Sequence, residues 1–204
     1  MLPLYLASAS PRRRELLESL GLRFGVEPPD VDERVAHGES ALDHVVRLAA
    51  KKAATAAGAL RERGIEALVL SADTTVTIGG EILGKPGDDA EAMAMLRRLA
   101  GARHEVLTAC RLVRIDDGRA AATVVISGVR FNPWSERLAL WYVGTGEPMD
   151  KAGAYGIQER GVLLCAGIDG SWSNVVGLPL ELLPPLFEDV GDDLLARVEG
   201  HNRG

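Results

Sequence analysis

Residues 66–80, EALVLSADTTVTIGG, carry the strongest strand pattern in the sequence. Aliphatic and β-branched residues dominate this stretch, and the Gly79-Gly80 pair at its end is typical of a turn. We predict a buried core strand that breaks at Asp73 and resumes from Thr75 to Ile78. A carboxylate at the end of an apolar strand often holds a metal or activates water in α/β proteins. Taken alone, however, Asp73 is more simply interpreted as a turn-forming residue.

Strands and helices alternate on both sides of this core strand. Residues 3–8 (PLYLAS) and 162–170 (VLLCAGIDG) read as buried strands, and residues 104–115 and 121–131 as a hairpin around residues 116–118. Helices are expected from Pro11 with Ser10 as N-cap, from Ser40 to Gly58 or Gly64, from Asp88 to Gly101, over 135–143, and after residue 170, with a tail frayed from about residue 198. The interleaving predicts one α/β domain over residues 1–204 with a mixed, twisted sheet and flanking helices.

The composition narrows the classes of function. The chain has 204 residues, is 47% hydrophobic, and has a formal net charge of −6. This acidic balance argues against general binding to nucleic acids or membrane surfaces. The sequence contains neither a run of about 20 apolar residues nor a Cys-x-x-Cys pair, so we expect a cytoplasmic protein without a structural zinc site. We expect the two cysteines to be buried, reduced thiols.

Residues 6–21, LASASPRRRELLESLG, place three arginines at the start of the first predicted helix. The first turn of a helix carries unpaired N–H groups and a positive dipole end, which favour acidic side chains. A bound polyanion would remove this conflict, because a helix N-terminus with arginine makes a phosphate site. Successive helical positions differ by about 100°, so at most two of the arginines can face one ligand. A solvated basic face is the alternative.

Other charged residues carry weaker signals. Lys85 lies in a turn, ILGKPGD, from which a lysine side chain can reach a phosphate. Lys51 and Lys52 are neighbours on the second helix, so only one of them can point inward. The acidic cluster of Asp30, Asp32 and Glu33 follows two prolines and is able to supply oxygen ligands to a divalent cation. For each of these residues, exposure to solvent is the simpler interpretation.

Together these segments resemble a known family. LASASPRRRELL, VDE, AAKKA, SADTTVTIGGEILGKP, LAGARHEVLTA and DKAGAYGIQERG occur in this order and are similar to the Maf-like nucleoside triphosphate pyrophosphatases. The resemblance runs from about Leu4 to Leu180. It implies a Maf/inosine-triphosphatase-like α/β fold with two lobes around a cleft, often as a homodimer. It also implies hydrolysis between the α and β phosphates with a divalent cation, magnesium or manganese.

The resemblance assigns expected roles by matching position. Asp73 would be the general base that activates water, and Glu33 and Asp73 would contact the metal. The triphosphate would be held by Ser8, Arg12, Arg13, Lys52 and Lys85. The segment DKAGAYGIQ resembles the branch that acts on dTTP and UTP, in which Arg12, Thr74 and Gln158 would set specificity. Glu159 and Arg160 depart from the family, which usually has a small glycine after the glutamine.

Three other functions remain open from the sequence. The protein could be a non-catalytic, nucleotide-binding regulator of cell division and septum formation, because the family name is tied to septum inhibition. It could belong to the related 7-methyl-GTP branch. A single-stranded nucleic-acid module ranks last, because aromatic residues make up only 4% of the chain and offer few stacking surfaces.

Overall fold

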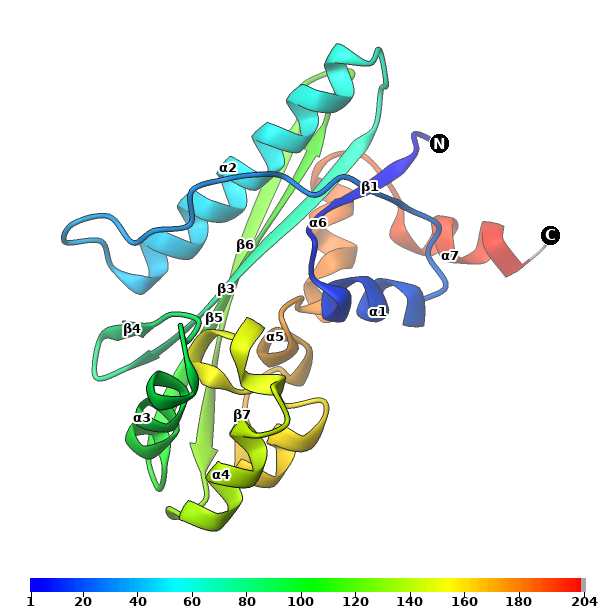
Figure 1. Ribbon diagram of the computed structural model, residues 1–204. Helices are drawn as coiled ribbons and strands as arrows, with labels where there is room; N and C mark the ends of the chain where they lie inside the picture. The colour runs from blue at the N-terminus through cyan, green and yellow to red at the C-terminus, as the bar shows by residue number, and fades with distance from the viewer. Residues whose placement is uncertain (203–204) are drawn as a thin grey trace.

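A seven-stranded mixed sheet organises the protein, whose computed structural model describes residues 1–202 (Figure 1). The strand order is β2-β1-β3-β5-β6-β7, and β4 pairs with β3. β1 is parallel to β2 and β3, whereas the pairs from β3 to β7 are antiparallel. The strands span Leu4–Ala7 (β1), Gly25–Val26 (β2), Leu68–Ile78 (β3), Glu81–Leu83 (β4), Arg103–Arg114 (β5), Ala120–Phe131 (β6) and Cys165–Asp169 (β7).

Helices flank this sheet, which confirms the predicted fold class. The α-helices span Pro11–Ser19 (α1), Ala41–Glu62 (α2), Asp89–Leu99 (α3), Glu136–Val143 (α4), Trp172–Val176 (α5), Leu183–Asp189 (α6) and Leu194–Asn202 (α7). Short 3₁₀ helices span Glu147–Asp150 (η1), Ala152–Ala154 (η2), Arg160–Leu164 (η3) and Leu180–Leu182 (η4).

Strand β3 is the centre of the sheet and runs unbroken for 11 residues. Its register with β5 is continuous from Leu68 to Thr77, so the predicted break at Asp73 is wrong. The side chain of Asp73 ion-pairs with Lys52 of α2 instead of forming a turn. This pairing allows a charged residue to lie within a strand that is otherwise buried.

Helix α2 packs against β3 and β5 and covers one face of the sheet (Figure 1). Ser40 caps it as predicted, since the Asp43 N–H donates to Ser40 Oγ at 3.1 Å. The helix ends at Glu62, and Gly64 follows with φ +69°, so the later of the two predicted ends is correct. A left-handed residue just past the last turn is a common helix stop.

Helix α1 starts at Pro11 as predicted, but its cap differs. Ser10 occupies the N-cap position, yet its side chain makes no capping hydrogen bond. The Ser10 N–H instead donates to Ser8 Oγ at 3.2 Å. No side chain among residues 1–202 therefore caps the first turn of α1, and that turn keeps donors for a ligand.

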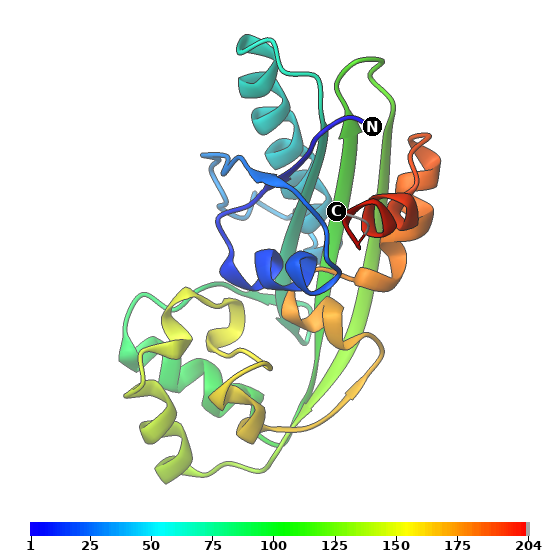
Figure 2. The same ribbon diagram turned by 90° about the vertical axis from the view of Figure 1, so that its right-hand side faces the viewer.

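Helices lie near both ends of the long strands (Figure 2). α3, α4 and the segment 147–164 gather at one end, and α2, α6 and α7 flank the sheet toward the other. The predicted strand over 162–170 begins only at Cys165, because η3 occupies the residues before it. β7 is half-exposed rather than buried, since it lies at the edge of the sheet and pairs only with the end of β6. The division into two lobes around a cleft stays a prediction.

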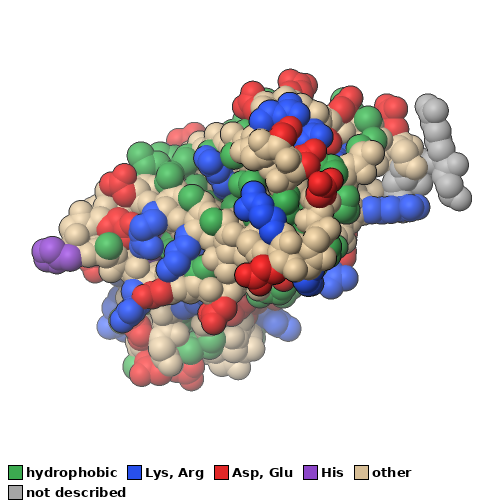
Figure 3. Space-filling view, turned by 90° about the horizontal axis from the view of Figure 1, so that it is seen from above, with side chains coloured by type: hydrophobic (Ala, Val, Ile, Leu, Met, Phe, Trp, Pro, Cys, Tyr) green, Lys and Arg blue, Asp and Glu red, His purple; other side chains and the backbone are tan. Residues whose placement is uncertain are grey.

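The surface and the C-terminal end complete the description. α7 is helical beyond residue 198, where fraying was expected, and residues 203–204 lie outside the described part of the chain. Over the face seen in Figure 3, basic and acidic side chains are interspersed. Within residues 1–202, none of the helices combines the length and apolar character needed to cross a bilayer. Cys110 is buried, Cys165 is half-buried, and both are free thiols.

Candidate active site

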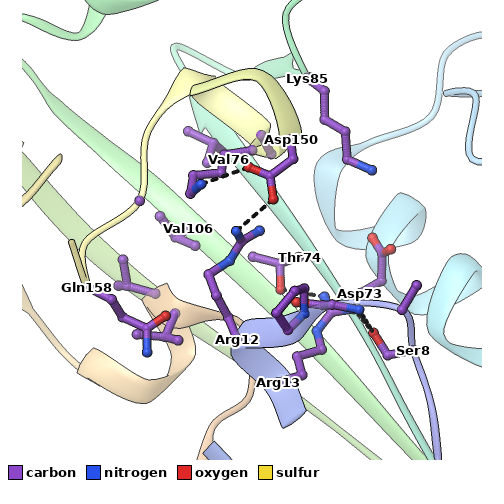
Figure 4. Close-up of a pocket in the computed structure, with 18 of the residues that line it drawn as sticks. Ser8, Arg12, Arg13, Asp73, Thr74, Val76, Lys85, Val106, Asp150 and Gln158 are labelled. Atoms are coloured by element: carbon purple, nitrogen blue, oxygen red, sulfur yellow. Dashed lines mark hydrogen bonds and ion pairs between the residues drawn. The ribbon is translucent and has the colours of Figure 1, made fainter. Parts of the chain in front are cut away.

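One pocket, with a volume of about 340 Å³, brings together every residue predicted for the site (Figure 4). β1 and β3 are neighbouring parallel strands, so the chain following β1 and the middle of β3 meet at the same place. The wall is completed by α1, the loop before α2, α2 itself, the Lys85 turn, the segment 150–158, and apolar residues of β5 and α5. The predicted residues in that wall are Ser8, Arg12, Arg13, Glu33, Lys52, Asp73, Thr74, Lys85 and Gln158.

Two of the three arginines of α1 face this pocket. Arg12 and Arg13 line it, whereas Arg14 points to solvent and pairs with Glu18 one turn along the helix, at 2.7 Å. This confirms that at most two of the three share one ligand site. The unusual positive charge at the start of α1 is thus directed into a cavity rather than spread over a solvated face.

Arg13 is held in place entirely by neutral oxygens. Its Nε donates to the Gly177 carbonyl at 2.9 Å, Nη1 to Ser8 Oγ at 3.2 Å and Nη2 to Thr74 Oγ1 at 3.0 Å. Burial lowers the pKa of Arg13, and the charge of Asp73 partly opposes this shift. A guanidinium has five N–H donors, so two remain for a ligand after these three bonds.

A chain of ion pairs crosses the pocket from β3 to the Lys85 turn. Lys52 Nζ lies 2.7 Å from Asp73 Oδ1 and 2.5 Å from Glu33 Oε1. Lys85 Nζ lies 3.4 Å from Glu33 Oε2. Lys52 is buried and its neighbour Lys51 is exposed, as the helical spacing requires. The charges of the two lysines therefore hold the two carboxylates within one small volume.

The two carboxylates differ in their surroundings. Partial burial acts to raise the pKa of Glu33, but the hydrogen bond and charge of Lys52, together with Lys85, outweigh it and hold this pKa below its ordinary value. Asp73 is buried, and only its Oδ1 is bonded to Lys52. Within residues 1–200 no protein donor bonds Asp73 Oδ2, which leaves this oxygen able to accept a proton or a hydrogen bond from a ligand.

The segment 150–158 adds two charged residues that the sequence analysis missed. Asp150 Oδ2 accepts from Arg12 Nη1 at 3.0 Å, and Asp150 Oδ1 accepts from Lys151 Nζ at 2.7 Å. Both residues line the pocket (Figure 4). Partial burial raises the pKa of Asp150, but these two cations outweigh that effect and lower it. The family resemblance included this segment, but only the tertiary contact with Arg12 identifies Asp150.

Buried contacts fix the shape of this loop. Glu147 accepts from Tyr142 Oη at 3.0 Å and from the Gly161 N–H at 3.2 Å. Gly153 has φ +71°, and a Cβ there would lie 3.0 Å from Val76 of β3, so only glycine fits. Gln158 thus lies in the pocket wall even though Glu159 and Arg160 replace the usual glycine.

Only Glu33 of the predicted acidic cluster belongs to the pocket. Asp32 pairs with Arg34 at 2.7 Å, and neither Asp30 nor Asp32 is in the pocket wall. Among residues 1–200, whose side chains the structure describes, no group of three or more potential metal ligands from His, Cys, Asp and Glu is present. This fits magnesium bound with a substrate, because Mg²⁺ is commonly held by one or two carboxylates plus phosphate oxygens rather than by an all-protein cage. Glu33 and Asp73 provide such a pair.

The pocket therefore suits a polyanion. Its wall holds five cationic side chains and three carboxylates in a chain whose net charge is −6. Figure 4 shows Gln158 at one end and Asp73, Ser8 and Lys85 toward the other. Such a pocket can bind phosphates at the cationic end, read a polar group near Gln158, and offer Asp73 Oδ2 as a base.

Comparisons with known proteins agree with this chemistry. The family model described as "Maf-like protein" matches residues 3–190. The chain is 53% identical over 191 residues to a dTTP/UTP pyrophosphatase of Symbiobacterium thermophilum, an alignment that covers 94% of this chain and 95% of that protein. It is 51% identical over 189 residues to a dTTP/UTP pyrophosphatase of Myxococcus xanthus, with 92% of each chain covered.

Proposed function

The chain belongs to the Maf-like family, and from this premise we propose that it is a nucleoside triphosphate pyrophosphatase that converts dTTP and UTP to the monophosphate and pyrophosphate. The names of the similar proteins support the reaction and the substrate. The observation on this chain that carries the proposal is the pocket in which Arg12, Arg13, Lys52 and Lys85 surround the carboxylate of Asp73.

The triphosphate binds at the cationic end of the pocket in this proposal. Arg13 offers two N–H donors that find no acceptor among the side chains and backbone of residues 1–200, and the first turn of α1 offers backbone N–H groups that its N-cap side chain does not bond. Arg12, Lys52 and Lys85 add charge, and Ser8 contributes its hydroxyl. Phosphoryl-type hydrolysis requires positioning and charge neutralisation more than covalent steps, which is what these residues supply.

Asp73 acts as the general base on the attacking water. The water oxygen forms a bond to the α-phosphorus, the bond from that phosphorus to the oxygen bridging the α and β phosphates breaks, and pyrophosphate leaves. The proton of the water passes to Asp73 Oδ2. Lys52 keeps the carboxylate in place through its bond to Oδ1, at 2.7 Å.

We also propose that a divalent cation, magnesium or manganese, takes part. Glu33 and Asp73 are the residues that would hold it, because these two pocket carboxylates lie on either side of Lys52. Asp150, the third carboxylate of the wall, is paired with Arg12 and Lys151 instead. When bound, such an ion neutralises developing negative charge on the phosphate oxygens.

The end of the pocket near Gln158 supports a substrate with a pyrimidine nucleobase. The Gln158 amide has both a donor and an acceptor, which complement the O/N–H/O edge of thymine or uracil. Arg12 and Thr74 are the other proposed specificity residues, and both line the same pocket.

We further propose a cytoplasmic homodimer formed along β6. β6 pairs with β7 only over Gly128–Phe131, so Ala120–Ser127 has a strand partner on the β5 side alone. This open edge carries no charged side chain, and Ile126 in it is 51% exposed. An unprotected apolar edge strand has unpaired backbone N–H and C=O groups and can pair with a strand of another chain. If β6 of a second copy pairs with it antiparallel across a two-fold axis, the same backbone groups become hydrogen-bonded in both copies.

A substrate panel tests the function. Purified protein with magnesium is incubated with dTTP, UTP, CTP and 7-methyl-GTP, and the products are resolved by chromatography. We expect dTMP or UMP with equimolar pyrophosphate, and slower turnover of the other two. Preferred hydrolysis of 7-methyl-GTP would place the chain in the other branch. Nucleotide binding without turnover would favour the regulatory alternative instead.

A further inference from the structure

We propose that Thr108 and Asn174, which lie outside the pocket wall, are positioning residues that set Arg13 for the phosphates. The proposal rests on the proposed phosphate-binding role of Arg13. Thr108 lies on β5 directly opposite Thr74 of β3 in the antiparallel register. The hydroxyls of the two threonines contact each other on the side of the sheet where Thr108 also contacts α5. Thr108 and Asn174 are both completely buried.

Three hydrogen bonds, all donated in the direction from Arg13 toward Asn174, form a relay through the hydroxyls of Thr74 and Thr108. Arg13 Nη2 can only donate, so Thr74 Oγ1 accepts from it at 3.0 Å. At the other end, Thr108 Oγ1 donates to the Asn174 carbonyl at 3.0 Å. The two hydroxyls lie 2.9 Å apart, and since the Thr108 proton is already used, Thr74 donates to Thr108. The two ends of the relay therefore fix the direction of both hydroxyls.

Asn174 anchors the far end of the relay. Its Nδ2 donates to the Val106 carbonyl at 3.0 Å and to Ser127 Oγ at 2.8 Å, which ties the short helix α5 to β5 and β6. The residue just past α5 is Gly177, whose carbonyl accepts from Arg13 Nε. Asn174 thus accepts the last hydrogen bond of the relay through its carbonyl, and its side chain ties α5, the helix that precedes Gly177, to the sheet.

The acceptors around Arg13, which are the Gly177 carbonyl and the hydroxyls of Ser8 and Thr74, distinguish it from the other pocket cations because none of them is charged. Arg12 pairs with Asp150, Lys52 with Asp73 and Glu33, and Lys85 with Glu33. Arg13 has only neutral acceptors, so its orientation is fixed without cancelling its charge. Thr108 contributes by offering the Thr74 hydroxyl an acceptor at 2.9 Å. Without Thr108, the remaining acceptor for that hydroxyl is the Gly177 carbonyl, which is farther away at 3.5 Å and already accepts from Arg13 Nε.

Isosteric variants test the relay. Thr108→Val keeps the shape but cannot donate or accept, and Thr108→Ser restores the hydroxyl. Thr77→Val is the matched control, because Thr77 is a buried threonine of β3 that bonds the Glu81 carbonyl and is not in the pocket wall. Titration calorimetry with inorganic tripolyphosphate and magnesium measures phosphate binding without the nucleoside. We expect Thr108→Val to weaken binding about fivefold to tenfold, the net effect of one ordinary hydrogen bond, and Thr108→Ser and Thr77→Val to stay within about twofold of the unmodified protein.

Kinetics with UTP provide the second measurement. We expect Thr108→Val to raise KM by the same factor while changing kcat less. Unchanged tripolyphosphate affinity in Thr108→Val, equal weakening in Thr77→Val, or no binding by the unmodified protein would each overturn the proposal. If Thr108→Val does not fold, Thr108→Ala takes its place with the same expectations. Weakened tripolyphosphate binding in a protein that does not hydrolyse UTP would retain the relay and reject the proposed activity.

Discussion

His104 is a buried histidine whose side chain stays neutral in the folded protein at neutral pH. Its side chain lies between Phe131 and Tyr155, with ring centroids 5.0 and 5.3 Å away, and its Nε2 is 2.7 Å from Tyr155 Oη. Nδ1 is buried without a hydrogen-bond partner. Burial lowers the pKa of His104 from 6.5 to about 4. Because Tyr155 lines the pocket, this cluster also supports the wall of the site.

The lowered pKa of His104 predicts a pH-dependent stability. Above pH 6.5 both the folded and unfolded states leave the histidine neutral, whereas between pH 6.5 and 4 only the unfolded state takes up the proton. The free energy of unfolding should therefore fall by about 2 kcal/mol at pH 5 from this residue alone. We expect His104→Phe to lose that part of the pH dependence, measured as the difference between urea unfolding at pH 7.5 and at pH 5. An equal pH dependence in the two proteins would contradict the assignment.

Individual site residues differ in how visible they are from the sequence. Arg12 and Arg13 stand out because positive charge conflicts with the start of a helix, and Asp73 because it interrupts an apolar strand. Glu33 and Lys85 gave only weak local signals, for which exposure to solvent was the simpler interpretation, and Gln158 was found only through the family resemblance. Asp150, Thr108 and Asn174 were missed, since their roles depend on partners far away in the chain, and no local pattern distinguishes them from ordinary polar residues.

At the scale of elements, local signals were reliable and tertiary effects were not. The hairpin between β5 and β6 formed around residues 116–118 as predicted, because a turn with Gly118 at φ +76° depends only on its own residues. The break predicted at Asp73 is wrong, because Lys52 on another element stabilises the carboxylate within the strand. The strand predicted over 162–170 begins late for a similar reason. Its first residues pack as η3 beside α4, a contact that the apolar pattern alone does not reveal.

The different caps of α1 and α3 lead to a prediction about stability. Asp88 accepts a hydrogen bond from the Glu91 N–H at 2.8 Å, whereas the Ser10 side chain makes no capping bond. We expect Asp88→Ala to lower the free energy of unfolding by about 1 kcal/mol and Ser10→Ala by a few tenths at most. Urea unfolding of the two variants without ligand measures both values. A loss in Ser10→Ala as large as in Asp88→Ala would show that Ser10 caps α1 after all.

At the scale of the whole molecule, the proposed dimer depends on the open edge of β6. Ile126→Lys places a charge within that edge, so we expect the variant to sediment as a monomer at concentrations where the unmodified protein is a dimer. Leu140→Lys is the matched control, because Leu140 is a similarly exposed apolar residue on α4, outside the open edge. Dissociation by Leu140→Lys instead would assign the interface to α4. A monomeric unmodified protein would reject the dimer.

The distribution of charge also operates at this scale. The chain as a whole is acidic, yet one cavity concentrates five cations next to three carboxylates. The net negative charge of the chain disfavours binding of polyanions over most of the surface, whereas the cavity supplies a local site for a small polyanion. Asp73, the proposed general base, is paired with Lys52 in this cavity.

The most direct test of this site is the kcat for pyrophosphate release from UTP by Asp73→Asn, measured with magnesium beside the unmodified protein. Asp32→Asn, which removes a carboxylate outside the pocket wall, is the control, and thermal unfolding verifies that each variant is folded. If Asp73 Oδ2 takes the proton of the attacking water, kcat should fall at least about 100-fold in Asp73→Asn and stay unchanged in Asp32→Asn. A folded Asp73→Asn protein whose kcat stays within about threefold of the unmodified value, far less than the loss of a general base, would contradict that role.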